Sequence, residues 1–222
     1  MLTLLLSLAL QDLPGAKPAP KDEKWVKRHE GFLADVKAKP DCGLLFLGDS
    51  ITDGWRGKKA IFEAAFGAHK PVNLGISGDR TQHVLWRIQN GELEGIKPKA
   101  AVIMIGTNNI GQSNPETAAS AIAGNQAIVA HLRKTFPELK ILLLGVFPRS
   151  EKPDHAHRAT IKEINDALAK IEGVKFLDIG PKFLAADGTL PKELMPDFLH
   201  LSEKGYQIWA DAIKADVDAL MK

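Results

Sequence analysis

One serine and one histidine stand out among the residues that could do covalent chemistry. Ser50 follows a short apolar run and lies in the sequence Gly-Asp-Ser-Ile-Thr. A nucleophilic serine needs a base, normally a histidine, and that base needs a carboxylate to orient it. His200 has Asp197 three residues before it, a spacing that can bring the carboxylate to the imidazole in a turn. An Asp and a His so spaced are more often structural, and it is the presence of Ser50 that favours a catalytic interpretation.

The remaining histidines and the single cysteine give little support for a metal site. His155 and His157 are close enough to ligate a metal, but a solvated loop explains them better. Cys42 is the only cysteine, which excludes an intramolecular disulfide and a multi-cysteine metal centre. The other four histidines are expected within helices or before a strand: His29, His69, His83 and His131. We therefore predict no metal and no cofactor.

Several familiar motifs are missing from the sequence. It has no Gly-x-Gly-x-x-Gly and no phosphate-binding loop that ends in Gly-Lys-Ser/Thr, so nucleotide binding has no support. Ser50 does not lie in a Gly-x-Ser-x-Gly elbow, which argues against the fold in which that elbow presents the nucleophile.

The elements that must position these residues follow from the apolar pattern. Five short apolar runs each end at a glycine, as expected of strands buried on both faces of a parallel sheet: 44–47, 72–74, 101–105, 141–144 and 174–179. Helical periodicity lies before and between them, over 22–38 and around 84–88, 122–132, 161–171 and 206–220, with Ser202 as the N-cap of the last helix. This alternation predicts an α/β protein, a three-layer αβα sandwich around a five-stranded parallel sheet.

Small and polar residues follow the first three of these strands. Ser50 follows the first strand, Gly78 the second and Asn108 the third. Open parallel sheets bind ligands beyond the carboxyl ends of their strands, so these residues are expected at one crevice.

These residues make the sequence resemble a known family. The block around Ser50, Gly78, Asn108 and Asp197-x-x-His200 are similar, in the same order, to the motifs of the GDSL or SGNH hydrolases, and the resemblance spans residues 44–210. Within the family, the stretch 73–91 looks most like the catalytic subunits of intracellular platelet-activating-factor acetylhydrolase. The resemblance implies a flavodoxin-like fold and a serine esterase that acts on acetyl or other short-acyl esters. It also suggests a homodimer.

The resemblance also implies a role for each site residue. Ser50 would be the nucleophile, His200 the base and Asp197 the group that orients His200. The oxyanion donors would be the backbone N–H groups of Ser50 and Gly78 and the side-chain amide of Asn108. Each has a structural alternative: Ser50 and Gly78 as turn residues, Asn108 as a loop residue, His200 as a surface histidine and Asp197 as a helix-entry acid. The neighbouring Asp49, Asp53, Asp79 and Arg87 are expected to support the site or the fold, and Trp55, Trp86 and Phe198 could line a pocket or belong to the core.

Composition and the N-terminus limit partners and location. The chain has 222 residues and a net charge of +2, which gives no reason to expect a nucleic acid or an anionic membrane as a partner. The apolar run 2–10 is too short to span a bilayer and precedes a linker-like stretch rich in proline. We expect residues 1–20 to be a signal peptide or a linker, and residues 21–222 to form a single domain. If residues 1–15 are a signal peptide the protein is exported, and otherwise it is cytoplasmic.

Two alternative functions remain open from the residues. One is a metal-dependent phosphoesterase that uses Asp49, Asp53, Asn108 and His200 as ligands. The other is a binding module without catalysis on the same fold, because a fold alone does not determine function. Within the esterase interpretation, an acetylated carbohydrate and a phospholipid analogue are the two candidate substrates.

Overall fold

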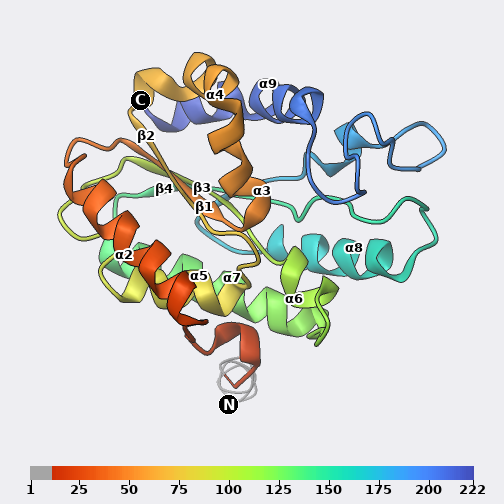
Figure 1. The fold of residues 1–222 in the computed structure, drawn as a ribbon, viewed down its shortest axis with the longest axis horizontal. Coiled ribbons are helices and arrows are strands. Elements are labelled where there is room, and N and C mark those ends of the chain that lie inside the picture. Colours follow the sequence, from red (N-terminus) through yellow and green to blue (C-terminus); the bar gives the residue numbers. More distant parts are fainter. Residues whose placement is uncertain (1–11) are drawn as a thin grey trace.

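A five-stranded parallel sheet forms the centre of the computed structural model, which describes residues 12–222 (Figure 1). The strand order is β2-β1-β3-β4-β5, and every pairing is parallel. The strands are β1 (Leu44–Gly48), β2 (Pro71–Gly75), β3 (Ala100–Met104), β4 (Lys140–Leu144) and β5 (Lys175–Leu177). The predicted sheet is confirmed, and its order is that of flavodoxin-like proteins. The last strand is shorter than its apolar run.

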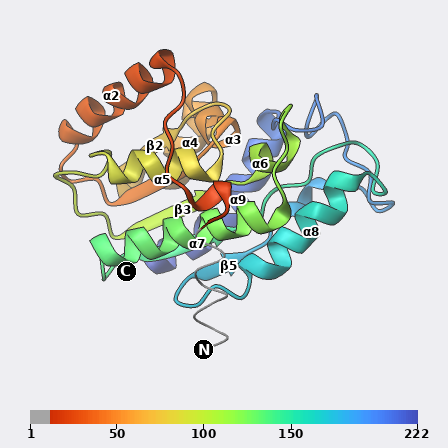
Figure 2. The same ribbon diagram turned by 90° about the horizontal axis from the view of Figure 1, so that it is seen from below.

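Helices cover both faces of the sheet, as the alternating pattern predicts (Figures 1 and 2). One layer contains α2 (Glu23–Lys37), α5 (Thr81–Gln89), α7 (Ala118–Thr135) and α8 (Ala156–Leu168), and the other contains α4 (Lys59–Phe66) and α9 (Glu203–Leu220). Two short helices, α3 (Ser50–Asp53) and α6 (Thr107–Gly111), follow β1 and β3 directly. Four 3₁₀ turns complete the described part: Pro14–Ala16, Gly54–Lys58, Gly67–His69 and Gly180–Phe183.

The side chains of β1 show how the sheet builds two cores. Successive residues of a strand point to opposite faces, so Leu44 and Phe46 pack against α4 and α9, whereas Leu45 and Leu47 pack against the α2, α5 and α7 layer. All four side chains are completely buried. This two-sided burial explains why the strands read as continuous apolar runs.

Helix caps fix where the flanking helices begin. The carboxylate of Asp22 accepts a hydrogen bond from the backbone N–H of Trp25 at the start of α2. Ser202 is the N-cap of α9, as predicted, and its hydroxyl accepts from the N–H of Gly205.

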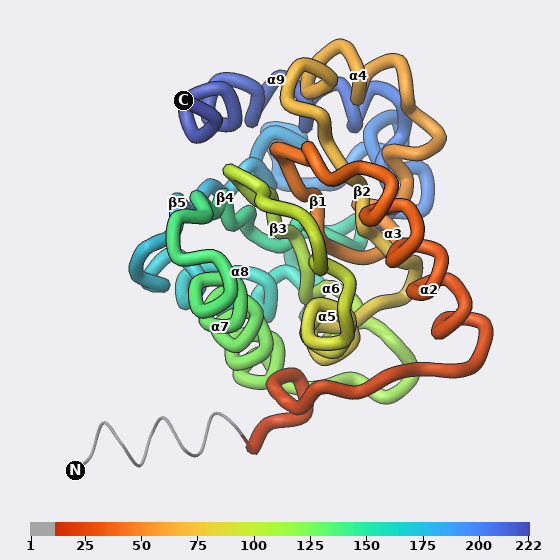
Figure 3. Tube along the Cα trace, turned by 90° about the vertical axis from the view of Figure 1, so that its left-hand side faces the viewer, coloured from red at the N-terminus to blue at the C-terminus, as the bar shows by residue number. Residues whose placement is uncertain are grey.

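The structure describes the N-terminal region only from residue 12 onward. The apolar run 2–10 lies outside the described residues. The turn Pro14–Ala16 lies against α5 and α7, with Gly15 buried (Figure 3). Among the helices of residues 12–222, none is both long and apolar enough to cross a membrane. Cys42 is 2% exposed, and burial raises the pKa of its thiol to about 11.

Candidate active site

Ser50 is the first residue of α3, two residues after β1 ends at the carboxyl edge of the sheet. The preceding Asp49 caps this short helix, because its Oδ1 accepts from the backbone N–H of Ile51 at 2.9 Å. A second hydrogen bond comes from β2, where Asn73 Nδ2 donates to the carbonyl of Thr52 at 2.9 Å. The turn that carries Ser50 is thus fixed at both ends, while Ser50 itself stays partly exposed.

His200 meets Ser50 across 150 residues of sequence. Its Nε2 lies 2.9 Å from Ser50 Oγ, and its Nδ1 lies 2.7 Å from Asp197 Oδ2. This arrangement suits a tautomer with the proton on Nδ1, so that Nε2 accepts from the serine hydroxyl. The structure therefore brings together the three residues that spacing and motif select.

The side chain of Asp197 holds the turn from Asp197 to His200 by accepting hydrogen bonds from its backbone. Asp197 Oδ1 accepts from the N–H of Leu199 at 3.1 Å and from the N–H of His200 at 2.7 Å. Phe198 between them has a φ of 58°, in the left-handed region that residues other than glycine seldom occupy. Partial burial works to raise the pKa of Asp197, but the bonds from the side chain and backbone of His200 outweigh it and hold that pKa below its ordinary value.

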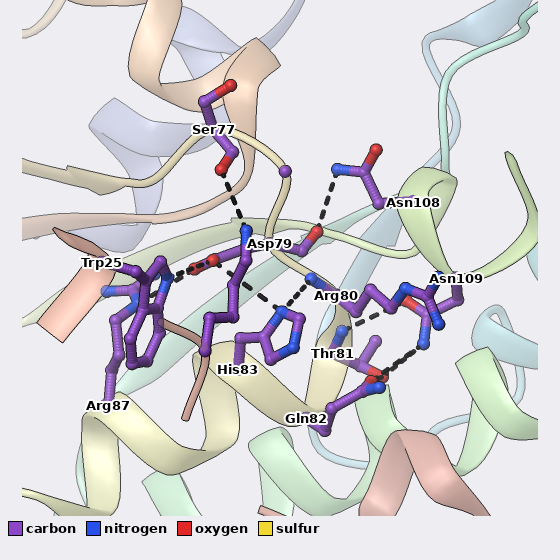
Figure 4. A network of polar contacts seen from close by, with 12 residues as sticks. Trp25, Ser77, Asp79, Arg80, Thr81, Gln82, His83, Arg87, Asn108 and Asn109 are labelled. Atoms are coloured by element: carbon purple, nitrogen blue, oxygen red, sulfur yellow. Dashed lines mark hydrogen bonds and ion pairs between the residues drawn. The ribbon is translucent and has the colours of Figure 1, made fainter. Parts of the chain in front are cut away.

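The loop after β2, which contains Gly78, is bonded to Asn108 of the short helix α6, and Figure 4 shows this bond between Asn108 and Asp79. The Nδ2 of Asn108 donates to the backbone carbonyl of Asp79 at 2.9 Å, and Asn108 is 7% exposed. Gly78 has a φ of +75°, which explains the choice of glycine there. The loop after β2 is also tied to the end of β1, since the N–H of Ile76 donates to the carbonyl of Gly48 at 3.3 Å.

Asp79 anchors this loop in the core through its side chain (Figure 4). Its carboxylate accepts from Trp25 Nε1 at 2.6 Å and from Arg87 Nε at 3.0 Å. Arg87 also bonds Glu92, and Asp79, Arg87 and Glu92 are all completely buried. Burial raises the pKa of Asp79 to about 6, even though Arg87 and Trp25 favour its charged form. The expectation of a supporting role for Asp79 and Arg87 agrees with these contacts.

Asp49 is the second buried carboxyl group beside the site. It is completely buried, and its Oδ2 has no hydrogen-bond partner. Burial raises the pKa of Asp49 to about 7, with the neighbouring charge of Asp79 acting in the same direction.

The remaining residues named from the sequence lie elsewhere or serve the core. Asp53 pairs with Arg56 at 2.8 Å and Arg28 at 3.2 Å. His155 caps α8, and His157 Nδ1 lies 3.0 Å from Ser150 Oγ. The indole rings of Trp55 and Trp86 pack within the two cores. No group of three His, Cys, Asp or Glu side chains in residues 12–222 is arranged to hold a metal ion.

Comparison with known proteins places this architecture among hydrolases. Platelet-activating factor acetylhydrolase IB subunit alpha1 of Rattus norvegicus is 38% identical over 201 residues, which cover 87% of this chain and 84% of the relative. A GDSL-like lipase from Bacteroides thetaiotaomicron matches with a TM-score of 0.67 at 21% identity, over 86% of this chain and 97% of the other. An acetyl xylan esterase, AlAXEase, matches with a TM-score of 0.67 at 19% identity, over 79% of this chain and 99% of the other. At these identities the two structural matches concern the fold alone.

The acetylhydrolase relative and a matching family model together define the class as carboxylic ester hydrolases. The family model described as GDSL-like Lipase/Acylhydrolase family matches residues 46–208, which is most of the chain. The chain belongs to this family, and it is an ester hydrolase.

Sequence reasoning missed a group of polar residues next to the Gly78 loop and α6. Asn109 follows Asn108, and its side chain bonds Thr81, Gln82 and Glu116. Its place beside Asn108 was the available signal, but the partners lie 7 to 28 residues away and their pairing needs the fold.

Proposed function

We propose that Ser50 is the nucleophile of this esterase, with His200 as its base and Asp197 as the residue that orients His200. The observation that carries the proposal is the continuous hydrogen-bonded chain, 2.9 Å from Ser50 Oγ to His200 Nε2 and 2.7 Å from His200 Nδ1 to Asp197 Oδ2. Both distances are within the range required for proton transfer.

The reaction has two halves. Ser50 Oγ attacks the carbonyl carbon of the ester while its proton passes to His200 Nε2. When the tetrahedral intermediate collapses, the bond to the alcohol oxygen breaks, the alcohol leaves with the proton from His200, and an acyl-enzyme remains on Ser50. A water molecule then attacks the acyl carbon while its proton passes to His200 Nε2. When this second tetrahedral intermediate collapses, the bond to Ser50 Oγ breaks, the proton returns from His200 to Ser50 Oγ, and the acid leaves.

The oxyanion of each tetrahedral intermediate needs donors that are already in position. We assign the backbone N–H groups of Ser50 and Gly78 and the Nδ2 of Asn108 to this role. Asn108 Nδ2 carries two hydrogens, and the bond to Asp79 O uses one of them. The other hydrogen is available to the substrate, while the first bond fixes the plane of the amide.

Mutation of the nucleophile tests the proposal. Ser50→Ala is expected to abolish hydrolysis of 4-nitrophenyl acetate, because the group that forms the acyl-enzyme is gone. Ser113→Ala is the matched control, since Ser113 is exposed and lies outside the hydrogen bonds of Ser50 and His200. Activity of Ser50→Ala within a few fold of the parent would refute the assignment.

A metal-dependent phosphoesterase is separated from an esterase by chelation. EDTA is expected to leave hydrolysis of 4-nitrophenyl acetate unchanged, and a phosphonate that labels serine is expected to eliminate it. The opposite pair of results would favour the phosphoesterase, and absence of labelling at Ser50 would favour a binding module.

We propose an acetyl or other short-acyl ester as the substrate, supported by the 38% identity to an acetylhydrolase subunit. The alcohol part is either a carbohydrate or a phospholipid analogue. Values of kcat/KM for acetylated sugars, aryl acetates and acetylated phospholipids would identify the preferred class. A preference for long acyl chains would contradict the proposal.

The homodimer and the signal peptide are separate proposals. The same relative is named as a subunit, which supports an assembly of more than one chain, and light scattering of the purified protein would test whether it is a homodimer. N-terminal sequencing of the protein from its native cells would show whether the apolar segment is removed.

A further inference from the structure

The segment before α2 is attached to the body of the protein through Gly15. The N–H of Gly15 donates to Ser120 Oγ at 2.7 Å, and its carbonyl accepts from Thr81 Oγ1 at 3.0 Å. Both bonds are buried, although they join positions 105 and 66 residues apart. In Figure 3 the segment runs past the ends of α5 and α7, the two helices that supply these side chains.

Only glycine fits at this contact. A Cβ atom on Gly15 would lie 2.1 Å from the carbonyl oxygen of Ser120, a backbone atom that cannot turn away. The facing residue on α7 is also a glycine, and a Cβ on Gly124 would lie 2.4 Å from the carbonyl oxygen of Gly15. Two backbones therefore approach each other as closely as their atoms allow.

The bonds of Gly15 continue into a polar cluster. Ser120 Oγ donates to Glu116 Oε2 at 2.6 Å, and Asn109 Nδ2 donates to the same oxygen at 2.9 Å. Gln82 Nε2 and Arg80 Nη1 donate to Glu116 Oε1 at 2.7 and 2.9 Å. Burial works to raise the pKa of Glu116, but these four bonds outweigh it and hold that pKa below its ordinary value. Glu116 therefore acts as an ionised hub, with charge-assisted bonds that are stronger than neutral ones.

The same cluster joins the start of α5 to α6, next to the proposed oxyanion donors Gly78 and Asn108 (Figure 4). Asn109 Oδ1 accepts from the backbone N–H of Thr81 at 3.1 Å, and Asn109 Nδ2 donates to Thr81 Oγ1 at 3.0 Å. Thr81 is three residues after Gly78, and Asn109 directly follows Asn108. The distance between the Gly78 loop and α6 is therefore set by bonds in which Gly15 is the outermost member.

We infer that Gly15 is a positioning residue for the oxyanion donors, which acts by holding Ser120 and Thr81 in the cluster around Asn109 and Glu116. The inference rests on the proposed roles of Gly78 and Asn108. Donors must lie within a few tenths of an ångström of their best positions, and a shift of about 1 Å can cost roughly 100-fold in rate. The segment thus belongs to the enzyme, and a processed form must still contain Gly15.

The first test is Gly15→Ala in the full chain, assayed with 4-nitrophenyl acetate at a temperature where circular dichroism shows folded protein. We expect kcat to fall about ten-fold or more while KM stays within about two-fold, because transition-state binding is lost and substrate binding is not. Gly31→Ala is the matched control, since no atom lies within 4 Å of a Cβ at that helical position. If Gly15→Ala does not fold, Ser120→Ala replaces it, because that change removes the bonds of Ser120 Oγ to Gly15 and to Glu116 without adding an atom. A folded variant with the kcat of the parent would overturn the inference.

A double-mutant cycle distinguishes positioning from general destabilisation. Once Asn108→Ala has removed one donor, Gly15→Ala is expected to lower kcat by less than about three-fold, because much of what it misplaces is already gone. Equal effects in both backgrounds would overturn the inference and leave the oxyanion assignment standing. If Asn108→Ala alone leaves kcat unchanged, the oxyanion assignment fails, and the inference fails with it.

Discussion

The carboxylate of Asp197 makes three hydrogen bonds within its own turn. Oδ1 accepts from two backbone N–H groups, of Leu199 and His200, and Oδ2 accepts from the imidazole. One oxygen therefore shapes the turn, and we expect the other to favour the His200 tautomer with its proton on Nδ1. A substitution that keeps the first function and changes the second can separate them.

Asp197→Asn is that substitution. The amide oxygen can keep the backbone bonds, but the amide nitrogen donates where the carboxylate accepted, so it favours the tautomer that cannot take the Ser50 proton. We expect kcat to fall about 10³-fold or more with little change in the melting temperature. Asp187→Asn is the matched control, because Asp187 caps a similar turn through Thr189 away from the site. A loss under ten-fold would show that Asp197 does not orient His200 during catalysis.

Asn108→Ala tests the oxyanion assignment directly. Removal of one preorganised donor typically lowers kcat by about 10² to 10³. We expect this loss in steady-state assays with 4-nitrophenyl acetate, with KM changed by no more than about three-fold. A large rise in KM at constant kcat would instead assign Asn108 to substrate binding.

The buried Asp49 predicts a pH dependence of stability. Its pKa is raised to about 7 in the folded protein from an ordinary 3.8, so between these values the folded state binds more protons than the unfolded state. The stability that this group contributes is present at low pH and is lost as the pH rises through about 7. The side chain of Asp49→Asn stays neutral at every pH. The difference in melting temperature, variant minus parent, is therefore expected to increase from about pH 5 to about pH 8. The exposed Asp35→Asn is the control, and parallel curves for Asp49→Asn and the parent would contradict the prediction.

The residues that the sequence marks locally are the ones that the structure brings together at the candidate site. Ser50 lies in a recognisable block, and Asp197 and His200 are three residues apart, so each carries its own signal. Gly15 and Glu116 carry none. Their partners are up to 105 residues away, and a glycine in a proline-rich stretch looks like a linker until its neighbours are known.

At the scale of elements, α9 supports the short helix that begins with Ser50. The hydroxyl of Tyr206 donates to the carbonyl of Ile51 at 2.6 Å, and Tyr206 is 3% exposed. Gly54 makes room for this bond, since a Cβ there would lie 2.0 Å from the hydroxyl oxygen. The last helix of the chain is thereby connected to the first turn after β1.

Tyr206→Phe removes this link without changing the packing of the ring. The carbonyl of Ile51 is left in the core without this partner, so we expect a loss of about 1 to 3 kcal/mol in the free energy of unfolding, measured in urea. Gln207→Ala is the control on an exposed position of α9. Stability equal to that of the parent would indicate that the carbonyl finds another donor.

The sequence predicts the strands and long helices well and the short elements poorly. Each run buried on both faces has a strong apolar signal, and α7 is long enough for its period to be visible. The helix α4 has eight residues and α3 has four, too few turns for periodicity to separate a helix from a loop. The short helix α3 is nevertheless the one that carries Ser50.

At the scale of the whole molecule, the sheet separates two cores that each contain two tryptophans. Trp25 and Trp86 belong to the α2 and α5 layer, and Trp55 and Trp209 belong to the α4 and α9 layer. Because the strands of one sheet line both cores, neither layer can lose its packing without exposing the sheet. This favours the prediction that residues 21–222 form a single domain, to which the segment around Gly15 also belongs through its bonds to Ser120 and Thr81.

Fluorescence can test that prediction one layer at a time. A Trp25→Phe/Trp86→Phe variant reports only on the second layer, and a Trp55→Phe/Trp209→Phe variant reports only on the first. In each variant we expect the fluorescence transition in urea to coincide with the transition in circular dichroism, as in two-state unfolding. Separate midpoints in either variant would show that the layers unfold independently.

The burial of the Cys42 thiol allows a dye to be attached selectively to a second, exposed cysteine. A maleimide reacts with a thiolate, and this sulfur is both shielded by the core and reluctant to ionise near neutral pH. A second cysteine at an exposed site such as Lys192 would therefore take up a dye selectively, with the native cysteine left in place. Movements of the turn around His200 during turnover could then be followed by single-site fluorescence in the otherwise unaltered enzyme.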